Sequence, residues 1–252
     1  MNTYDVTNKV AIVTGGTSGI GRATTLALVK AGAKVLFTGR NAVAAQEIEE
    51  ETNGNAFFFP ADQRSSEDMK AVAEKAVSAF GKIDVLFACA GVEQKPVMIA
   101  DIEDEEIDRV LNTNLKGTIQ LVRNVLPEIK KSQGSIILCS SFWGSRAAAG
   151  VATYAASKAA VSHFGRCLAV ELGDDNVRVN TISPGGVDTT MFRRVLNTQE
   201  ARDNWAKDVP LKRAATPEEL AEVVLWLSSS ATYINAQDII VDGGMSVKMV
   251  GV

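Results

Sequence analysis

The stretch Val10-Ala-Ile-Val-Thr-Gly-Gly-Thr-Ser-Gly-Ile-Gly21 decides the fold of this chain. Its first half is a short apolar run, typical of a fully buried strand. Its second half carries three glycines with the spacing G-x-x-x-G-x-G. A helical pattern over 22–31 and a second strand over 34–38 follow directly. In this context, glycines let the backbone approach a pyrophosphate, and the helix N-terminus stabilises its charge. The stretch therefore predicts dinucleotide binding, with a tight structural turn as the alternative.

The rest of the chain continues this alternation of strands and helices, and only 189–215 reads as an irregular insertion. No repeat or linker divides residues 1–252, so we predict one α/β domain. Its expected form is a Rossmann-type, doubly wound parallel sheet of seven strands with helices on both faces, in three layers. The further expected elements are strands over 55–59, 84–88, 135–140, 177–182 and 239–241, and helices starting at Ser65 or Ser66 and over 103–131, 153–172 and 216–228.

Composition excludes several classes of function. The formal net charge of -4 argues against nucleic acid as a partner, because phosphate binding requires a basic face. No apolar run has the length of a membrane span, and the polar N-terminus lacks a signal-peptide core, so we expect a cytoplasmic protein with no membrane partner. Cys89, Cys139 and Cys167 are interpreted as buried thiols. The single histidine, His163, is interpreted as a packing or interface residue, and we expect no metal site.

Tyr154 and Lys158 are four residues apart in a predicted helix, so their side chains share one face. A phenol in water has a pKa of ~10, and a nearby cation favours the phenolate. The pair could therefore move a proton at neutral pH. Taken alone, the pattern is common, and its structural interpretation is an amphipathic tyrosine beside a solvated lysine.

Several motifs occur in one order along the chain, and Ser141 lies thirteen residues before Tyr154. Together they resemble the short-chain dehydrogenase/reductase family, in its single-domain form, over essentially the whole chain. The motifs are Thr14-Gly-Gly-Thr-Ser-Gly-Ile-Gly21, Asp62, Asn112-Thr-Asn-Leu-Lys-Gly117, Ser141, Tyr154-x-x-x-Lys158 and Pro184-Gly185.

The resemblance implies hydride transfer between a nicotinamide and a carbonyl or alcohol carbon, with four catalytic residues. Tyr154 would exchange the proton, and Lys158 would favour its phenolate and bind the nicotinamide ribose. Ser141 would hold the substrate oxygen, and Asn114 would hold a water that relays protons to the lysine. The structural alternatives are a serine that only ends a strand, as Ser140 would, and a solvated helical asparagine.

The resemblance also implies cofactor and substrate contacts. The carboxylate of Asp62 would bond the adenine amino group, unless it only forms a turn. The 189–215 segment would shape the substrate pocket, although its aromatic residues and those near Ser141 could equally pack in the core or between subunits. The cofactor-binding candidates are Gly15, Thr17, Ser18, Gly19, Ile20, Gly21, Arg40, Asp62, Gln63, Ala90, Gly91, Tyr154, Lys158, Pro184, Gly185, Val187 and Thr189; the substrate-binding candidates are Phe142, Trp143, Gly186, Met191 and Phe192.

One departure concerns the family's Asn-Asn-Ala-Gly motif after the fourth strand, which here reads Ala88-Cys89-Ala90-Gly91. The small residues keep a close backbone approach to the cofactor, but both side-chain amides are lost. We expect a modest effect on stability. Cys89 is interpreted as an unreactive buried thiol.

Residues at the end of the second strand favour NADP(H), with NAD(H) possible. NAD binders of this architecture carry an acidic residue about 20 positions past the glycine loop, and Gly39 stands there. Arg40 follows, with a planar fork suited to a 2′-phosphate. The alternative is that Arg40 only opens the next helix in solvent. The loop also lacks the extra basic residue of many NADP-preferring relatives, since Ser18 stands in its place.

We therefore predict an NADP(H)-dependent oxidoreductase for a small carbonyl or secondary-alcohol substrate, whose identity the sequence leaves open. One alternative is a 3-oxoacyl-(carrier protein) reductase-like enzyme, which needs a basic docking patch near the site. Another is a non-catalytic NAD(P)-binding sensor on the same fold. The resemblance also implies a homotetramer or homodimer, paired through the helices over 104–131 and 153–172.

Overall fold

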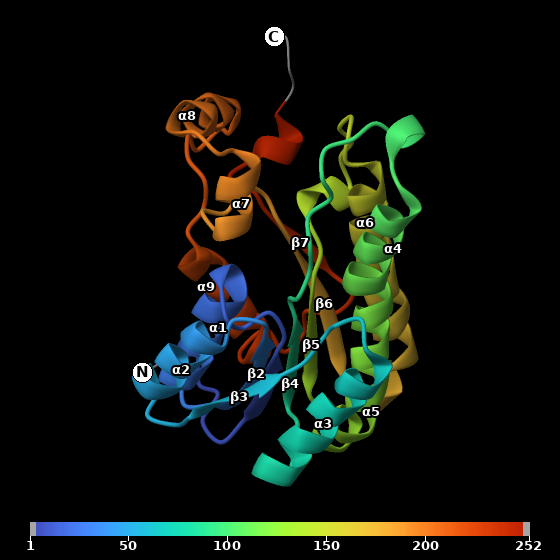
Figure 1. Ribbon diagram of the computed structural model, residues 1–252. Coiled ribbons are helices and arrows are strands. Elements are labelled where there is room, and N and C mark those ends of the chain that lie inside the picture. The colour runs from blue at the N-terminus through green and yellow to red at the C-terminus, as the bar shows by residue number, and fades with distance from the viewer. Residues whose placement is uncertain (1–3, 249–252) are drawn as a thin grey trace.

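A computed structural model describes residues 4–248 of the chain (Figure 1). Its centre is a seven-stranded sheet in the order β3-β2-β1-β4-β5-β6-β7, and every neighbouring pair is parallel. The predicted doubly wound α/β fold is therefore confirmed. The strands are β1 (Val10–Val13), β2 (Lys34–Gly39), β3 (Ala56–Pro60), β4 (Val85–Ala88), β5 (Ser135–Cys139), β6 (Arg178–Pro184) and β7 (Asp238–Val241).

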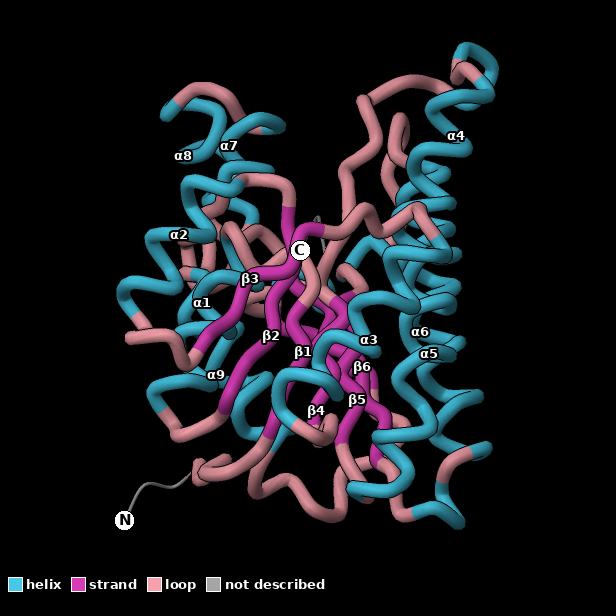
Figure 2. Tube along the Cα trace, turned by 60° about the horizontal axis from the view of Figure 1, so that its bottom comes forward, coloured by secondary structure: helices cyan, strands magenta, loops and turns pink. Residues whose placement is uncertain are grey.

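Helices cover both faces of the sheet. Figure 2 shows α1, α2 and α9 on one side of the strands and α3, α5 and α6 on the other. The predicted starts of two helices are confirmed: Ser65 caps α3, and Thr216 and Glu219 form a capping box on α9. The helices are α1 (Gly19–Lys30), α2 (Ala42–Glu51), α3 (Ser66–Phe80), α4 (Asp104–Leu111), α5 (Gly117–Ser132), α6 (Ala152–Glu171), α7 (Thr190–Val195), α8 (Gln199–Asp208) and α9 (Pro217–Ser228).

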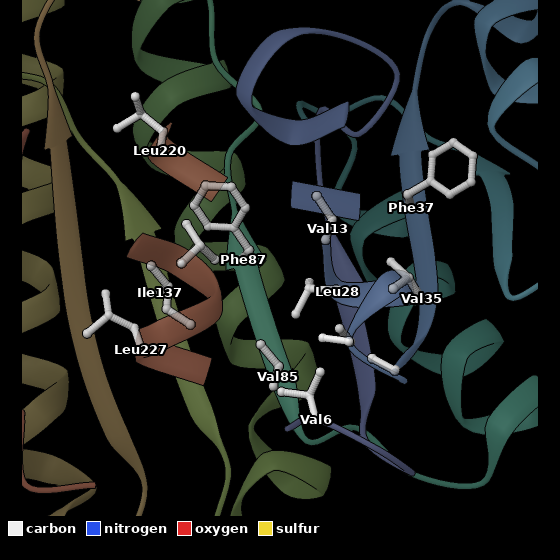
Figure 3. Packing of buried hydrophobic residues seen from close by; sticks show 14 of the residues in the cluster. Val6, Val13, Leu28, Val35, Phe37, Val85, Phe87, Ile137, Leu220 and Leu227 are labelled. Carbon is white, nitrogen blue, oxygen red and sulfur yellow. The ribbon is translucent and has the colours of Figure 1, made fainter. Parts of the chain in front are cut away.

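Two apolar clusters hold the three layers together, because neighbouring residues of a strand point to opposite faces of the sheet. On β1, Val13 joins the cluster beneath α1 and α9, which Figure 3 shows with Leu28 and Leu220 packed over the strands. The adjacent Ile12 joins the second cluster, beneath α3 and α5. Burial on both faces explains why the central strands β1, β4 and β5 read as continuous apolar runs.

The structure differs from the sequence-based prediction in three places. The helix expected over 103–131 is interrupted by a π-helical turn, η2 (Asn112–Lys116), between α4 and α5. The segment 189–215 is not irregular, since it holds α7 and α8, each capped by a threonine side chain. Cys167 is exposed rather than buried, because it lies on the outer side of α6. His163 on the same helix is also exposed.

The order of the strands fixes where a ligand can bind. From β1, the chain moves outward to β2 and β3, and then returns to place β4 on the other side of β1. Parallel sheets of this kind bind ligands outside the carboxyl ends of the strands where the order reverses. The loops after β1 and β4 meet at that point. The segment with α7 and α8 follows β6 and stands at the same end of the sheet (Figure 1).

Candidate active site

The glycine loop after β1 is shaped as an open cradle. Gly15 and Gly19 both have positive φ angles, of 69° and 50°. A Cβ atom at Gly15 would lie 3.1 Å from the Cα of Ala90, and one at Gly19 would lie 2.9 Å from Cγ2 of Thr189. A Cβ at Gly21 would collide with the carbonyl oxygen of Gly15. Only glycines allow this turn, and they leave backbone at the start of α1, where an anion is stabilised.

A buried threonine joins the ends of β1 and β4. The Oγ1 atom of Thr14 accepts hydrogen bonds from the backbone N–H groups of Cys89 and Ala90, both at 3.1 Å. These bonds fix the backbone where the family's two asparagines are replaced. A hydrogen bond with Cys139 and burial raise the pKa of the Cys89 thiol. This direction agrees with an unreactive thiol, but the side chain is half-buried and not fully buried as the sequence predicted.

Lys158 is buried and held at a fixed place beneath the site. Its Nζ donates a hydrogen bond to the carbonyl of Cys139 at 2.9 Å, at the end of β5. The same atom lies 5.8 Å from the centroid of the Tyr154 ring. A Cβ at Gly91 would lie 3.3 Å from this Nζ and 3.2 Å from Oδ1 of Asn114. The structure thus brings the lysine and the asparagine to one short segment of backbone, with the tyrosine ring near the lysine.

The two serines at the end of β5 have different tasks. Ser140 Oγ donates to the carbonyl of Lys158 at 2.7 Å and accepts from Ser162 Oγ at 2.9 Å, so it fastens α6 to the strand. Ser141 Oγ accepts from the backbone N–H of Trp143 at 3.3 Å and caps a one-turn helix, η3 (Phe142–Gly144). The sequence alone indicates only a strand-ending role for Ser140, but in the structure its side chain positions the backbone of Lys158.

The π-helical turn explains how an asparagine is used inside a helix. Such turns occur frequently at functional sites, and Asn114 is buried within this one. Its Oδ1 accepts from the N–H of Val92 at 2.8 Å. Its Nδ2 donates to the carbonyl of Val92 at 3.0 Å and to Oγ of Ser157 at 3.2 Å. Asn114 therefore ties the loop after β4 to α6, and it is not a solvated helical residue.

The edge of the sheet at β2 and β3 carries charged side chains around a buried amide. Arg64 forms an ion pair with Asp62 at 2.7 Å and holds the pKa of its carboxyl below the ordinary value; the charge of Arg40 adds to this effect. Arg40 is exposed. Gln63 is buried, and neither atom of its amide finds a hydrogen-bond partner within residues 4–248. Such an amide is free to receive a ligand or a water molecule.

The end of β6 leads into a segment rich in aromatic contacts. Gly185 packs against Asp242, since a Cβ there would lie 2.7 Å from the Cβ of that residue. The ring of Trp205 covers Gly186 and meets Phe192 edge-on at 5.0 Å between centroids. On the other side of the site, Phe142 and Trp143 stack at 4.4 Å. The remaining predicted residues have these positions: Pro184 ends β6, Val187 is buried and bridges Ala215, Thr189 caps α7, and Met191 is half-buried in α7.

These residues fit a nicotinamide dinucleotide. The glycine cradle would accept its pyrophosphate, the orphaned amide of Gln63 offers a donor and an acceptor near the β3 end, and Lys158 offers a cation near Gly91. Within the described part of the chain, no cluster of three or more potential metal ligands is found. None of the helices in residues 4–248 combines the length and apolar character that crossing a bilayer requires.

Known proteins that are similar to this chain include reductases and a dehydrogenase. The family model described as "Enoyl-(Acyl carrier protein) reductase" matches residues 15–246. The 3-oxoacyl-[acyl-carrier-protein] reductase of Chlamydia muridarum is 36% identical over 245 residues, covering 95% of this chain and 98% of that protein. The 7alpha-hydroxysteroid dehydrogenase of Escherichia coli is 34% identical over 242 residues, covering 94% and 93%. The crystal structure of levodione reductase matches with a TM-score of 0.93 at 29% identity, covering 96% and 99%.

Proposed function

Because the chain belongs to the short-chain dehydrogenase/reductase family, a family of oxidoreductases that bind NAD(P)(H), we propose that it is an NADP(H)-dependent enzyme. It transfers a hydride between the nicotinamide and a carbonyl or secondary alcohol of a small organic substrate. The observation that carries this proposal is the position of Lys158 and Asn114 beside Gly91, after the carboxyl end of β4, with the Tyr154 ring centroid 5.8 Å from the lysine Nζ.

In the proposed mechanism, side chains of this chain supply the one proton that reduction of the carbonyl requires. In the reducing direction the bound cofactor supplies a hydride to the carbonyl carbon. Tyr154 donates its phenolic proton to the carbonyl oxygen, which becomes the hydroxyl of the product. Ser141 donates a hydrogen bond to that oxygen as charge develops on it. Lys158 keeps a positive charge beside the tyrosine, and Asn114 holds the loop against which the lysine lies.

Cofactor binding is proposed for the residues predicted from the sequence. The loop Gly15–Gly21 would hold the pyrophosphate, and Arg40 the 2′-phosphate. Asp62 and Gln63 would face the adenine, and the backbone from Pro184 to Thr189 would border the nicotinamide. Support comes from the open cradle of the glycine loop and from the contact of Thr189 with Gly19.

We propose the segment 189–215 as the substrate-binding part of a single domain. Phe192 and Trp205 from this segment, with Phe142 and Trp143 from β5–α6, provide aromatic surface on two sides of the site. Arg194 of α7 pairs with Glu93 of the β4 loop at 3.2 Å and so links the two sides. These aromatic side chains would favour a ketone with an apolar body.

A carrier-protein-linked 3-oxoacyl reductase is the second candidate, favoured by the 36% identity to an enzyme of that name. It requires a basic docking patch, and the candidate basic residues for such a patch, Lys130, Lys131 and the arginines of α7, are engaged in ion pairs. Lys130 pairs with Asp175, and Lys131 pairs with Glu128. The arginines of α7 are also paired, with Asp188 and Glu93. This engagement supports the free small ketone as the primary substrate class. A non-catalytic sensor is disfavoured by the complete set of four catalytic residues.

The test is a substrate panel monitored at the absorbance band of the reduced nicotinamide. Cyclic and aromatic ketones, linear ketones and acetoacetyl-coenzyme A would each be offered with NADPH and with NADH. Tyr154→Phe serves as the matched control, because it removes one hydroxyl and keeps the ring. Consumption of NADPH by wild type alone supports the proposal, and preference for the thioester would favour the second candidate. If no substrate of any class oxidises either cofactor, the proposed reaction is wrong.

A further inference from the structure

A glutamine in the loop after β4 reaches the start of α6. Gln94 is only 3% exposed. Its Oε1 accepts a hydrogen bond from the backbone N–H of Tyr154 at 3.0 Å. Its Nε2 donates to the carbonyl of Gly150 at 2.9 Å. Both partners belong to the segment that delivers the catalytic tyrosine, so this one side chain joins the β4 loop to that segment.

The start of α6 needs such a partner. The first N–H groups of a helix have no acceptor within the helix, and the side chain of the preceding residue usually supplies one to the second or third helical residue. Here the preceding residue is Val151, whose side chain has no acceptor, and Tyr154 is the third residue of the helix. Gln94 therefore caps α6 from a distant part of the chain.

We propose that Gln94 is a positioning residue, which holds the phenol of Tyr154 against Lys158 by capping the first turn of α6. The inference rests on the proposed function of the site. One turn later, Lys158 is fixed independently, through Cys139 and Ser140. The first turn of a helix frays more readily than its interior. Loss of the Gln94 bonds would thus move the tyrosine while the lysine stays in place.

The turn before the helix depends on the same contact. Gly150 adopts a positive φ of 81°, and its carbonyl accepts from Gln94 Nε2 and from the backbone N–H of Val97 at 3.1 Å. The β4 loop therefore holds this turn by one side-chain bond and one backbone bond. Removal of the side-chain bond leaves the backbone bond, so we expect a local displacement and not a general loss of the loop.

Asn180 provides a matched control. It is a buried amide, 1% exposed, and it also makes one bond to a carbonyl and one to a backbone N–H, at Ile234 (2.8 Å) and Gln237 (3.1 Å). Its partners lie in the loop before β7, which contacts the C-terminal half of α6 and not its first turn. Asn180→Leu and Gln94→Leu therefore remove equivalent hydrogen bonds, but only Gln94→Leu releases Tyr154. The conservative variant Gln94→Glu keeps an acceptor for the tyrosine N–H, and its charge suits a helix N-terminus.

The experiment compares the three variants in kcat, in NADPH dissociation constant and in melting temperature. For Gln94→Leu we expect kcat to fall about 10- to 100-fold, as small misplacements of a reacting group do, with NADPH affinity within about twofold of wild type. Gln94→Glu should recover most of the lost kcat. Asn180→Leu should lower the melting temperature at least as much as Gln94→Leu and keep kcat. An unchanged kcat in Gln94→Leu, or an equal loss in Asn180→Leu, would overturn the proposal.

A second readout is independent of activity. Hydrogen exchange, measured by mass spectrometry on a peptide spanning 150–160, reports whether the first turn of α6 is protected. Gln94→Leu should exchange faster there than wild type, whereas Asn180→Leu should not. If wild type turned over no substrate, the proposed function would fail, and the exchange data would still decide whether Gln94 holds Tyr154. Equal protection in Gln94→Leu and wild type would refute the capping role.

Discussion

We predict that the choice of cofactor depends on one exposed guanidinium, and Arg40→Ala tests this directly. Arg40 follows the last residue of β2. The neighbouring polar groups have other partners: Asn41 Oδ1 accepts from the N–H of Ala44 and caps α2, and Thr38 is buried. Arg64, the nearest other arginine along this edge, is paired with Asp62. Arg40 is thus the cation best placed to bind a 2′-phosphate.

The expected size of the NADPH preference follows from the strength of a hydrogen bond between charged groups. Hydrogen bonds to charged groups contribute about 1.5–3 kcal/mol, which corresponds to roughly 10- to 100-fold in affinity. The adjacent Gly39 occupies the position at which NAD binders of this architecture carry an acidic residue. It therefore offers no carboxylate to bond the ribose of NADH or to repel a phosphate. We expect wild type to prefer NADPH and Arg40→Ala to lose most of that preference.

The assay measures kcat/KM for NADPH and for NADH with the best ketone of the panel. In Arg40→Ala, the NADPH value should fall roughly 10- to 100-fold, and the NADH value should change by less than about threefold. Lys70→Ala, which removes one positive charge from the exposed side of α3, is the control and should leave the ratio unchanged. A wild-type preference for NADH, or an Arg40→Ala ratio equal to that of wild type, would refute the reasoning.

Three further predictions concern catalysis, stability in acid and assembly. Tyr154→Phe should keep NADPH binding in a fluorescence titration and lose at least ~100-fold in kcat, and Ser141→Ala should lose roughly 10²–10³-fold; near-normal turnover in either would contradict its role. Arg109 lowers the pKa of Glu106 from 4.5 to about 2, so the pair stabilises the fold above pH 4.5 and loses that contribution as the pH falls from 4.5 towards 2. Glu106→Gln should therefore be less stable than wild type at neutral pH, by about 1 kcal/mol for a partly exposed pair, and the difference in chemical denaturation should vanish near pH 2; a constant difference would exclude this linkage. Light scattering at micromolar concentration should report a homotetramer or homodimer joined through α5 and α6, and a monomer would rule this out.

Regular periodicity made most of the fold predictable. The central strands β1, β4 and β5 are short apolar runs, and burial on both faces is what produces such a run. The capping box at Thr216 and the cap at Ser65 are local signals, and both were read correctly. The π-helical turn was not predicted, because no local sequence pattern marks it. The turn is tied instead to a tertiary hydrogen bond, which Asn114 accepts from the backbone of Val92.

The sequence predicts the residues proposed to react, but it does not predict the residues that hold them in position. Thr14, Ser140 and Gln94 act on backbone groups that lie far away in the sequence. Nothing in their own surroundings distinguishes a serine that ends a strand from one that fastens a helix. For Cys167, the error came from treating cysteine as uniformly buried, although it lies on the outward side of α6.

The loop after β4 is linked by side-chain hydrogen bonds to the end of β1, to the π-helical turn and to α6. Thr14 accepts a hydrogen bond from the backbone near its start, and Asn114 bonds to both backbone groups of Val92. Gln94 accepts from the backbone N–H of Tyr154 and so joins the loop to the helix that carries this residue. The cofactor cradle, the π-helical turn and the catalytic helix therefore share one short piece of backbone. Ala88 and Cys89, which replace the two family amides, belong to this segment. Because other side chains hold the segment from three sides, we expect the loss of those amides to have only a modest effect on stability.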